Sequence, residues 1–151
     1  MRFEWTIDEE DAEDPEEVKA ELGFHLNGIA QRNRRILARE RFPRLYKSGV
    51  RYGTDKDVAY VQRLLNCRQV LRQRTACCKS LCAWRVAELR NDAPNEQQAA
   101  LVDFVIEHED LDHDPLGVGL RPRASDGLIR VYHVNVRKAD GSVENPSRRL
   151  R

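Results

Sequence analysis

Three residues of the chain have side chains whose types suit acyl transfer: Cys78, His133 and Asn145. A cysteine thiolate attacks a carbonyl carbon, an imidazole holds the thiol proton as general base, and a carboxamide fixes the orientation and tautomer of that imidazole. The three residues are far apart in the sequence, so this chemistry depends on the elements that carry them.

Cys78 lies near the start of the stretch Thr75 to Arg90, which has the pattern of a helix. With Thr75 as N-cap, Cys78 falls in the first turn of a helix whose apolar face consists of Cys78, Cys82, Val86 and Leu89. A helix N-terminus favours a thiolate, and Arg74 and Lys79 add positive charge beside it. Free cysteine is also among the most often buried side chains, so this stretch alone favours a core residue over a nucleophile.

His133 lies within the clearest predicted strand, Leu128 to Lys138, which is rich in β-branched and aromatic residues. The segment Ser142 to Asn145 returns as its hairpin partner, and Pro146 ends that strand. A lone histidine in the middle of a strand is more often a packed residue than a catalyst. His133 therefore needs partners in space before a catalytic role is justified.

The length of the hairpin loop decides whether Asn145 can serve His133. A two-residue loop at Asp140-Gly141 places Asn145 on the face opposite His133. A three-residue loop, Ala139 to Gly141 with Gly141 left-handed, opposes Asn135 to Asn145 and puts Asn145 diagonal to His133 on one face. Only the three-residue loop is compatible with a His–Asn pair.

The chain also contains elements that precede this hairpin. Asp14-Pro15-Glu16-Glu17 is a strong helix start, and Gly23 and Gly28 weaken the helix that follows, so one long helix and two shorter ones both fit the sequence. Further helices are expected from Thr54 to Leu65 and strands at residues 3–7, 100–108 and 117–123, although Asn95 can instead begin a helix. Helices first and antiparallel strands afterwards predict an α+β fold.

Three ordered motifs resemble those of the transglutaminase-like cysteine-hydrolase proteins encoded by tailed phages and prophages. PRLYKSGVRY, residues 43–52, is similar to the family pattern P-x-L-Y-x-S-G-V-R-Y. ACCKSLCAWRVAELR, residues 76–90, is similar to G-D-C-E-D-L-A-x-W-R-x-A-E-L-R, and VYHVNVRKADGSVENPSR, residues 131–148, to a Y-H-V-V-V-R…A-D-G-x-x-E-D-P-S-R pattern. The resemblance implies a papain-like fold with Cys78 as nucleophile, His133 as base and Asn145 as orienting residue.

The chain departs from that family pattern around the implied nucleophile. Ala76, Cys77, Lys79 and Ser80 stand where the family has Gly, Asp, Glu and Asp, and Asn145 stands where Asp is usual. An asparagine can orient a histidine, but it stabilises an imidazolium less than a carboxylate does. The resemblance covers residues 43–148, which predicts a domain over residues 43–151 and an acidic docking arm with a helix over residues 1–42.

Composition excludes several classes of function. The formal net charge is +1, with acidic residues concentrated before residue 22 and arginines dominating from Arg32 to Arg90. No apolar run is long enough for a membrane span, and the four cysteines lack the spacing of a zinc site or a secreted disulfide framework. The run Asp110, Asp112, His113 and Asp114 lacks a cation-binding pattern, so neither a metal nor a cofactor is expected.

Two functions remain open from the sequence. The first is a structural or assembly protein of a phage particle that keeps the transglutaminase-like fold with a degenerate or residual Cys78–His133–Asn145 site. Such a protein would be found in the virion and, during assembly, in the host cytoplasm. Its partners would be other phage structural proteins in a multi-subunit complex. The second is an active cysteine hydrolase or acyltransferase that acts on amide bonds through a Cys78 thioester. Direct nucleic-acid binding by the arginines is disfavoured, because the net charge is near zero and no recognition motif is present.

Overall fold

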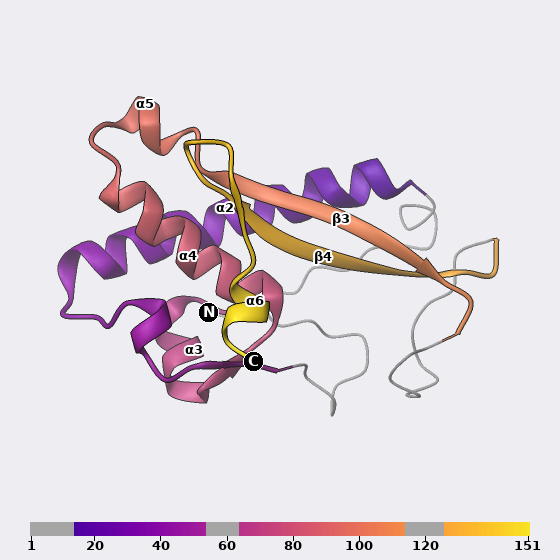
Figure 1. Ribbon diagram of the computed structural model, residues 1–151, viewed down its shortest axis with the longest axis horizontal. Helices are drawn as coiled ribbons and strands as arrows, with labels where there is room; N and C mark the ends of the chain where they lie inside the picture. Colours follow the sequence, from indigo (N-terminus) through magenta and orange to yellow (C-terminus); the bar gives the residue numbers. More distant parts are fainter. Residues whose placement is uncertain (1–13, 54–63, 114–125) are drawn as a thin grey trace.

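The computed structural model describes residues 14–53, 64–113 and 126–151, which fold into a mixture of helices and antiparallel strands. A long sheet carries helices on one face, with a smaller group of short elements beside it (Figure 1). The mixture is compatible with the predicted α+β class. The elements in chain order are α2 (Pro15–Arg39), η1 (Leu45–Lys47), β1 (Arg51–Tyr52), α3 (Cys67–Gln73), β2 (Thr75–Ala76), α4 (Cys78–Asp92), α5 (Glu96–Ala99), β3 (Asp103–Leu111), β4 (Ile129–Arg137), β5 (Val143–Glu144) and α6 (Pro146–Arg149).

The first described helix, α2, starts as its sequence predicts. The Asp14 carboxylate accepts hydrogen bonds from the backbone N–H groups of Glu16 and Glu17, at 3.0 and 3.4 Å, and Pro15 occupies the first turn. Of the two alternatives that the glycines left open, the structure has the single long helix, because α2 runs unbroken for 25 residues. Its buried face packs along α4, which supplies the tertiary support that outweighs the weak helix propensity of glycine.

Helix α4 is the centre of the molecule because it contributes to both hydrophobic clusters. Cys82, Ala83 and Val86 pack with α2 and the sheet in the first cluster. Leu81 and Trp84 pack with η1, β2 and α3 in the second cluster. Its residues from the second to the eleventh are therefore buried except for the partly exposed Arg85, and the buried ones include the charged Lys79 and Glu88, so the helix is covered on most sides rather than amphipathic.

The start of α4 differs slightly from the prediction. Cys77 and not Thr75 is the N-cap, because Thr75 and Ala76 form the short strand β2, parallel to β1. Cys78 is consequently the first residue of the helix, and its place in the first turn is confirmed. The predicted apolar face is also confirmed, since Cys78 and Leu89 pack against the cluster that contains Cys82 and Val86.

The sheet has the order β3–β4–β5 with both pairs antiparallel. Of the two alternatives for the hairpin after β4, the structure has the three-residue loop: the Lys138 N–H donates to the Ser142 carbonyl at 2.8 Å, and Gly141 has a φ of 88°, which suits glycine. Val136 is thus opposite Glu144, and the same register would place Asn135 opposite Asn145. The structure therefore has the odd-loop register that a His–Asn pair would require.

Other predicted elements were misplaced or lie beyond what the structure describes. The strand expected over residues 100–108 begins only at Asp103, because α5, capped by Asn95, occupies the preceding residues. The strands expected at residues 3–7 and 117–123 and most of the helix expected from Thr54 lie outside the described residues. Among the described helices, none combines the length and apolar character needed to cross a membrane.

Candidate functional site

Cys78 lies at the N-terminal end of α4 with its side chain partly buried against the first hydrophobic cluster. Its neighbour Cys77 is similarly half-buried and is the N-cap of the helix, with its sulfur 4.0 Å from the Ser80 hydroxyl of α4. Within the described part of the chain, the Cys78 sulfur has no hydrogen-bond partner, and a nucleophilic cysteine requires a base within reach. The position suits a thiolate at a helix N-terminus, but no described general base contacts it.

His133 lies on the face of β4 that points away from α4. Its neighbour Val134 is buried in the same cluster as Cys82, as is Val136, whereas the His133 side chain is 55% exposed. Side chains alternate between the two faces of a strand, so the imidazole and the core-facing residues are on opposite sides of the sheet. The imidazole Nε2 instead lies 3.4 Å from a carboxylate oxygen of Glu109 on β3. The structure does not bring His133 to Cys78.

Asn145 is at the junction between β5 and α6, where it caps the helix. Its side-chain oxygen accepts the backbone N–H of Arg148 at 3.0 Å, and the residue itself is exposed. Capping is a common role for asparagine immediately before a Pro-initiated helix. The carboxamide oxygen is therefore bonded to the backbone of α6, and no described bond connects it to His133.

Two other side chains of α4 connect this helix to the backbone of β4. The buried Lys79 donates from Nζ to the carbonyl of Tyr132 at 3.2 Å, and the Cys82 thiol donates to the carbonyl of Val134 at the same distance. Burial raises the pKa of the Cys82 thiol well above its ordinary value. Cys82 is therefore a protonated thiol in the hydrophobic core. The side chains of Lys79 and Cys82 provide hydrogen-bond donors for the Tyr132 and Val134 carbonyls of β4.

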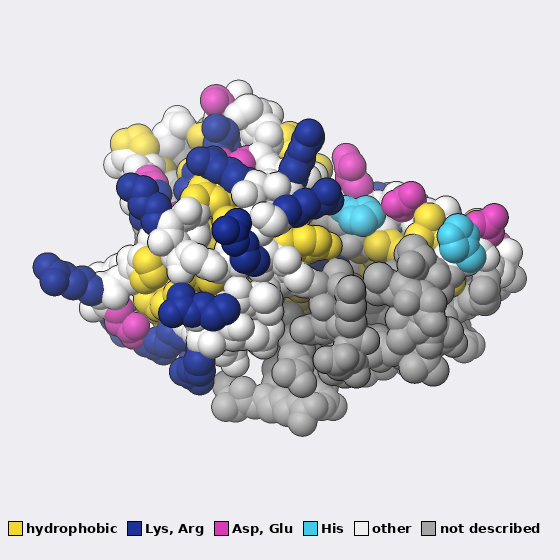
Figure 2. Space-filling model, turned by 60° about the horizontal axis from the view of Figure 1, so that its bottom comes forward, with side chains coloured by type: hydrophobic (Ala, Val, Ile, Leu, Met, Phe, Trp, Pro, Cys, Tyr) yellow, Lys and Arg dark blue, Asp and Glu magenta, His cyan; other side chains and the backbone are white. Residues whose placement is uncertain are grey.

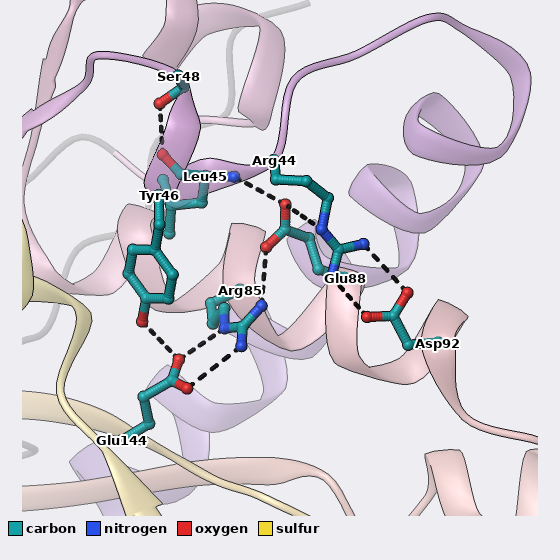
Figure 3. A network of polar contacts seen from close by, with 8 residues as sticks. All are labelled: Arg44, Leu45, Tyr46, Ser48, Arg85, Glu88, Asp92 and Glu144. Atoms are coloured by element: carbon teal, nitrogen blue, oxygen red, sulfur yellow. Dashed lines mark hydrogen bonds and ion pairs between the residues drawn. The ribbon is translucent and has the colours of Figure 1, made fainter.

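A polar network lies further along α4 and involves residues not predicted as a site (Figure 3). Glu88 is almost completely buried, with 1% of its side chain exposed. One carboxylate oxygen accepts the backbone N–H of Leu45 at 2.8 Å, and the other accepts Nη1 of Arg85 at 3.1 Å. Arg44 lies 3.7 Å from the first oxygen and also forms two bonds to Asp92. Glu88 thus fixes η1 onto α4 with its charge compensated.

The same network reaches the sheet through Arg85. Its guanidinium forms two bonds to the Glu144 carboxylate, at 2.6 and 3.2 Å, and the Tyr46 hydroxyl donates to that carboxylate as well. Burial acts to raise the pKa of Glu144, but the bonds from Arg85 and Tyr46 lower it below its ordinary value. Burial and the Glu144 carboxylate raise the pKa of the Tyr46 phenol. Glu144 is therefore ionised, and it connects η1, α4 and β5.

The sequence did contain a signal for this network. Arg85 and Glu88 lie at an i,i+3 spacing within WRVAELR, and Tyr46 and Glu144 belong to the other two motifs on which the family resemblance depends. These residues contact one another and not Cys78. The motifs therefore encode the packing of η1, α4 and β5 at least as much as they encode a catalytic centre.

A cavity of about 430 Å³ adjoins this network. It lies between the C-terminal parts of α2 and α4 and is lined by Leu37, Ala38, Phe42, Pro43, Arg44, Glu88, Asn91 and Asp92. None of the three predicted site residues lines it. No ligand chemistry follows from it, because its charged groups Arg44, Glu88 and Asp92 are already bonded to one another or to the backbone.

No group of three or more potential ligands suited to a metal ion occurs among residues 14–53, 64–113 and 126–151. Of the acidic run predicted not to bind a metal, Asp112 lies 3.0 Å from Nδ1 of His113, Asp110 forms an ion pair with Arg130, and Asp114 lies outside the described residues.

Comparison with known proteins gives no relative for this chain: no protein-family model, no curated protein and no solved structure matches it.

Proposed function

We propose that the chain is a non-catalytic assembly component, of the kind found in phage particles, built on a transglutaminase-like arrangement whose Cys78–His133–Asn145 site is degenerate. The observation that carries this proposal is the outward orientation of His133. With 55% of its side chain exposed and its nitrogen near Glu109, it lies on the face of β4 away from α4. Among the described residues, Cys78 then has no general base in contact with it.

The other two predicted site residues support the same proposal. The carboxamide of Asn145 is bonded to the backbone of α6, where it stabilises a helix instead of orienting an imidazole. The residues around Cys78 differ from the family pattern by the loss of three acidic positions and a glycine. An interaction module needs a stable fold but no catalytic site. The packing network of Glu88, Arg85 and Glu144 together with the separated Cys78, His133 and Asn145 is consistent with such a module.

The partners that follow from this proposal are other structural proteins of a phage particle in a multi-subunit assembly, with the virion as the final location. This part depends on the family resemblance of the three motifs, since no matched relative supports it. The polar network of Glu88, Arg85 and Glu144 supports a rigid scaffold, because its charges are buried and mutually bonded.

Two adjacent cysteines allow a controlled test. Cys77 and Cys78 are both half-buried at the same helix end, so Cys77 is an internal reference for the reactivity of Cys78. Alkylation by iodoacetamide at neutral pH is followed in Cys77→Ser and Cys78→Ser. We expect rates within about threefold of each other, as for two thiols without a base, and no effect of His133→Ala.

An active cysteine hydrolase or acyltransferase is the second candidate, favoured by the place of Cys78 at the first position of α4. It predicts alkylation of Cys78 at least about tenfold faster than that of Cys77, as expected for an activated thiolate, and loss of this difference in His133→Ala. That result would refute the non-catalytic proposal.

A further inference from the structure

The long helix α2 has an exposed side that no other described element covers. The helix runs along much of the length of the molecule (Figure 1), and its buried residues pack towards α4. We define the outer face of α2 by six exposed residues that recur every three or four positions and so lie along one side of the helix: Glu17, Glu21, Phe24, Gly28, Arg32 and Arg35.

Charged side chains are segregated on this molecule, although its net charge is only +1. Figure 2 shows Lys and Arg side chains gathered over one half of the visible face, with Asp, Glu and His side chains mainly over the described part of the other half. The outer face of α2 is divided in the same way, with Glu17 and Glu21 towards its start and Arg32 and Arg35 towards its end. None of these four side chains forms a hydrogen bond or ion pair with residues 14–53, 64–113 or 126–151.

The helix dipole accounts for only part of this division. The dipole favours acidic residues in the first turn and basic residues in the last turn, but Glu21, Arg32 and Arg35 lie further inside the helix, where its effect has decayed. Glu17 and Glu21 are four positions apart and repel each other, as do Arg32 and Arg35, three positions apart. A partner with the opposite charge at each end would relieve both repulsions.

Phe24 and Gly28 lie between the two charged ends of the outer face. Phe24 is 76% exposed, more than any other large hydrophobic residue of the described ranges. A Cβ at Gly28 would meet no atom within 4 Å, so packing within this chain does not require a glycine there, and a glycine inside a helix is less stable than an alanine. The missing side chain does leave room for an aromatic ring from another molecule.

The order of these residues makes the outer face complementary to itself in the antiparallel direction. Glu17 stands seven residues before Phe24, and Arg35 stands seven residues after Gly28. Seven residues of helix correspond to about 10 Å in both cases. When two α2 helices lie antiparallel with each Phe24 on the Gly28 of the other, each Glu17 is therefore opposite an Arg35. A parallel pair would instead bring like charges together.

We propose that two copies of this chain associate through the outer faces of α2, antiparallel, with Phe24 of each copy on Gly28 of the other. In the same register, Glu21, three residues before Phe24, lies beside Arg32, four residues after Gly28. The contact is isologous, so it closes at a dimer. This inference goes beyond the proposed function and does not depend on it, since the contact uses no residue of the predicted catalytic site.

The dimer is expected to be weak and sensitive to salt. The contact joins a single helix from each copy, and interfaces that bury less than about 1,200 Å² belong to weak or transient complexes. We expect a dissociation constant on the order of 10 µM at low salt. Added salt screens the ion pairs at both ends of the contact and should weaken it further.

The test measures the dissociation constant of the full-length protein by sedimentation velocity, from about 1 µM to about 500 µM protein and at about 50 mM and about 500 mM salt. Two double variants give each outer face a single sign of charge: Glu17→Lys with Glu21→Lys, and Arg32→Glu with Arg35→Glu. The control, Arg72→Glu with Arg137→Glu, makes the same change of net charge as the second of these on exposed residues of α3 and β4.

Two further variants test the centre of the contact. Phe24→Ser removes the exposed ring, and Gly28→Gln places a side chain where the single chain has open space. Glutamine also favours a helix more than glycine does, so Gly28→Gln should not lower the melting temperature. Each variant should nevertheless weaken association at least about tenfold, because each change occurs twice in the dimer. A purely structural role of Gly28 would not produce this combination.

We expect the wild type and the control to form a dimer of the same affinity. Each charge variant alone should associate at least about tenfold more weakly, because like charges then face each other. An equimolar mixture of the two charge variants should dimerise again, since one outer face is then wholly basic and the other wholly acidic. Circular dichroism verifies that every variant is folded.

Three results would overturn the inference. A wild type that stays monomeric at every concentration tested would refute self-association. A dimer that is as tight in Phe24→Ser and in both charge variants as in the wild type would place the interface elsewhere. A mass that keeps rising beyond two chains as the concentration increases would refute the closed antiparallel arrangement.

Discussion

The Glu88 carboxylate is the residue on which the packing of η1 against α4 depends most directly. Replacement by alanine leaves the Leu45 N–H buried without a partner and reduces the pairing of Arg85. We expect Glu88→Ala to lower the free energy of unfolding by about 3–5 kcal/mol, as for a broken buried ion pair. Glu88→Gln keeps an acceptor for Leu45 and should cost less, about 1–3 kcal/mol.

Urea denaturation followed by circular dichroism measures both changes. Glu96→Gln is the control, because the Glu96 side chain is 82% exposed in its pair with Arg34, and such surface pairs contribute about 0–1 kcal/mol. An effect of Glu88→Ala no larger than that of the control would contradict the role given to the buried carboxylate.

The four thiols are predicted to differ in reactivity according to burial. Burial raises the pKa of Cys67 to about 12 and that of Cys82 well above its ordinary value, whereas Cys77 and Cys78 are partly exposed. At pH 7.5, a value where buried thiols stay protonated, Ellman's reagent should modify about two thiols in the folded protein and all four after unfolding. Modification of only one thiol in the folded protein, lost in Cys78→Ser, would instead indicate an activated Cys78.

At the scale of single elements, Asn145 is predicted to act as a helix cap. Asn145→Ala removes the bond to the Arg148 N–H and should lower stability by about 0.5–2 kcal/mol. Asn145→Asp keeps a capping oxygen and should change stability little. Thermal unfolding of the two variants measures these changes. Equal decreases in melting temperature for Asn145→Ala and Asn145→Asp would show that Asn145 does not stabilise the protein by capping α6.

The interaction between Glu144 of β5 and Arg85 of α4 is predicted to weaken in acid. The pKa of Glu144 is lower in the folded protein than its ordinary value, so its stabilising effect is complete above the ordinary carboxyl pKa and is lost as pH falls through the folded value. The difference in melting temperature between wild type and Glu144→Gln should therefore be largest near pH 7 and shrink below about pH 5.

Tyr46→Phe provides a graded comparison for this pH dependence. It removes one donor to Glu144 and leaves the two bonds from Arg85, so its pH profile should lie between those of wild type and Glu144→Gln. A wild-type advantage over Glu144→Gln that persists undiminished at pH 3 would mean that another group governs the acid response.

At the scale of the whole molecule, α4 joins two hydrophobic clusters, so the described parts should unfold together. Leu26→Ala in the first cluster and Leu81→Ala in the second should each cost about 2–5 kcal/mol and shift one common transition. In a Trp5→Phe background, Trp84 fluorescence reports the second cluster and far-ultraviolet circular dichroism reports all helices. Separate midpoints for the two signals would show that the clusters unfold independently.

The sequence was sufficient for elements whose signals are local. The cap at Asp14 and the strand around His133 follow from residue preferences that act within a few positions, and both are confirmed, whereas the length of the loop ending at Gly141 was left open between two and three residues. The unbroken α2 was not predictable in this way, because its continuity past Gly23 depends on packing against α4.

The candidate site was less predictable than the fold for a physical reason. The sequence predicts that residues on a strand alternate, but it does not say which of the two faces meets α4. Val134 and Val136 occupy the core, and this choice turns His133 outward. The Glu88 and Glu144 network was missed because long-range pairing of charges leaves no periodic pattern in the sequence.

The enclosure of α4 limits how anything outside the molecule can reach it. Among the described residues, the middle turns of this helix are mostly buried, with Arg85 partly exposed, and Cys77 and Cys78 at its start and Asn91 and Asp92 at its end are more accessible. A reagent for Cys77 and Cys78 is therefore expected to reach them at the N-terminal end of α4. The modification rates of Cys77 and Cys78 by maleimides of increasing size would show how much space surrounds these thiols.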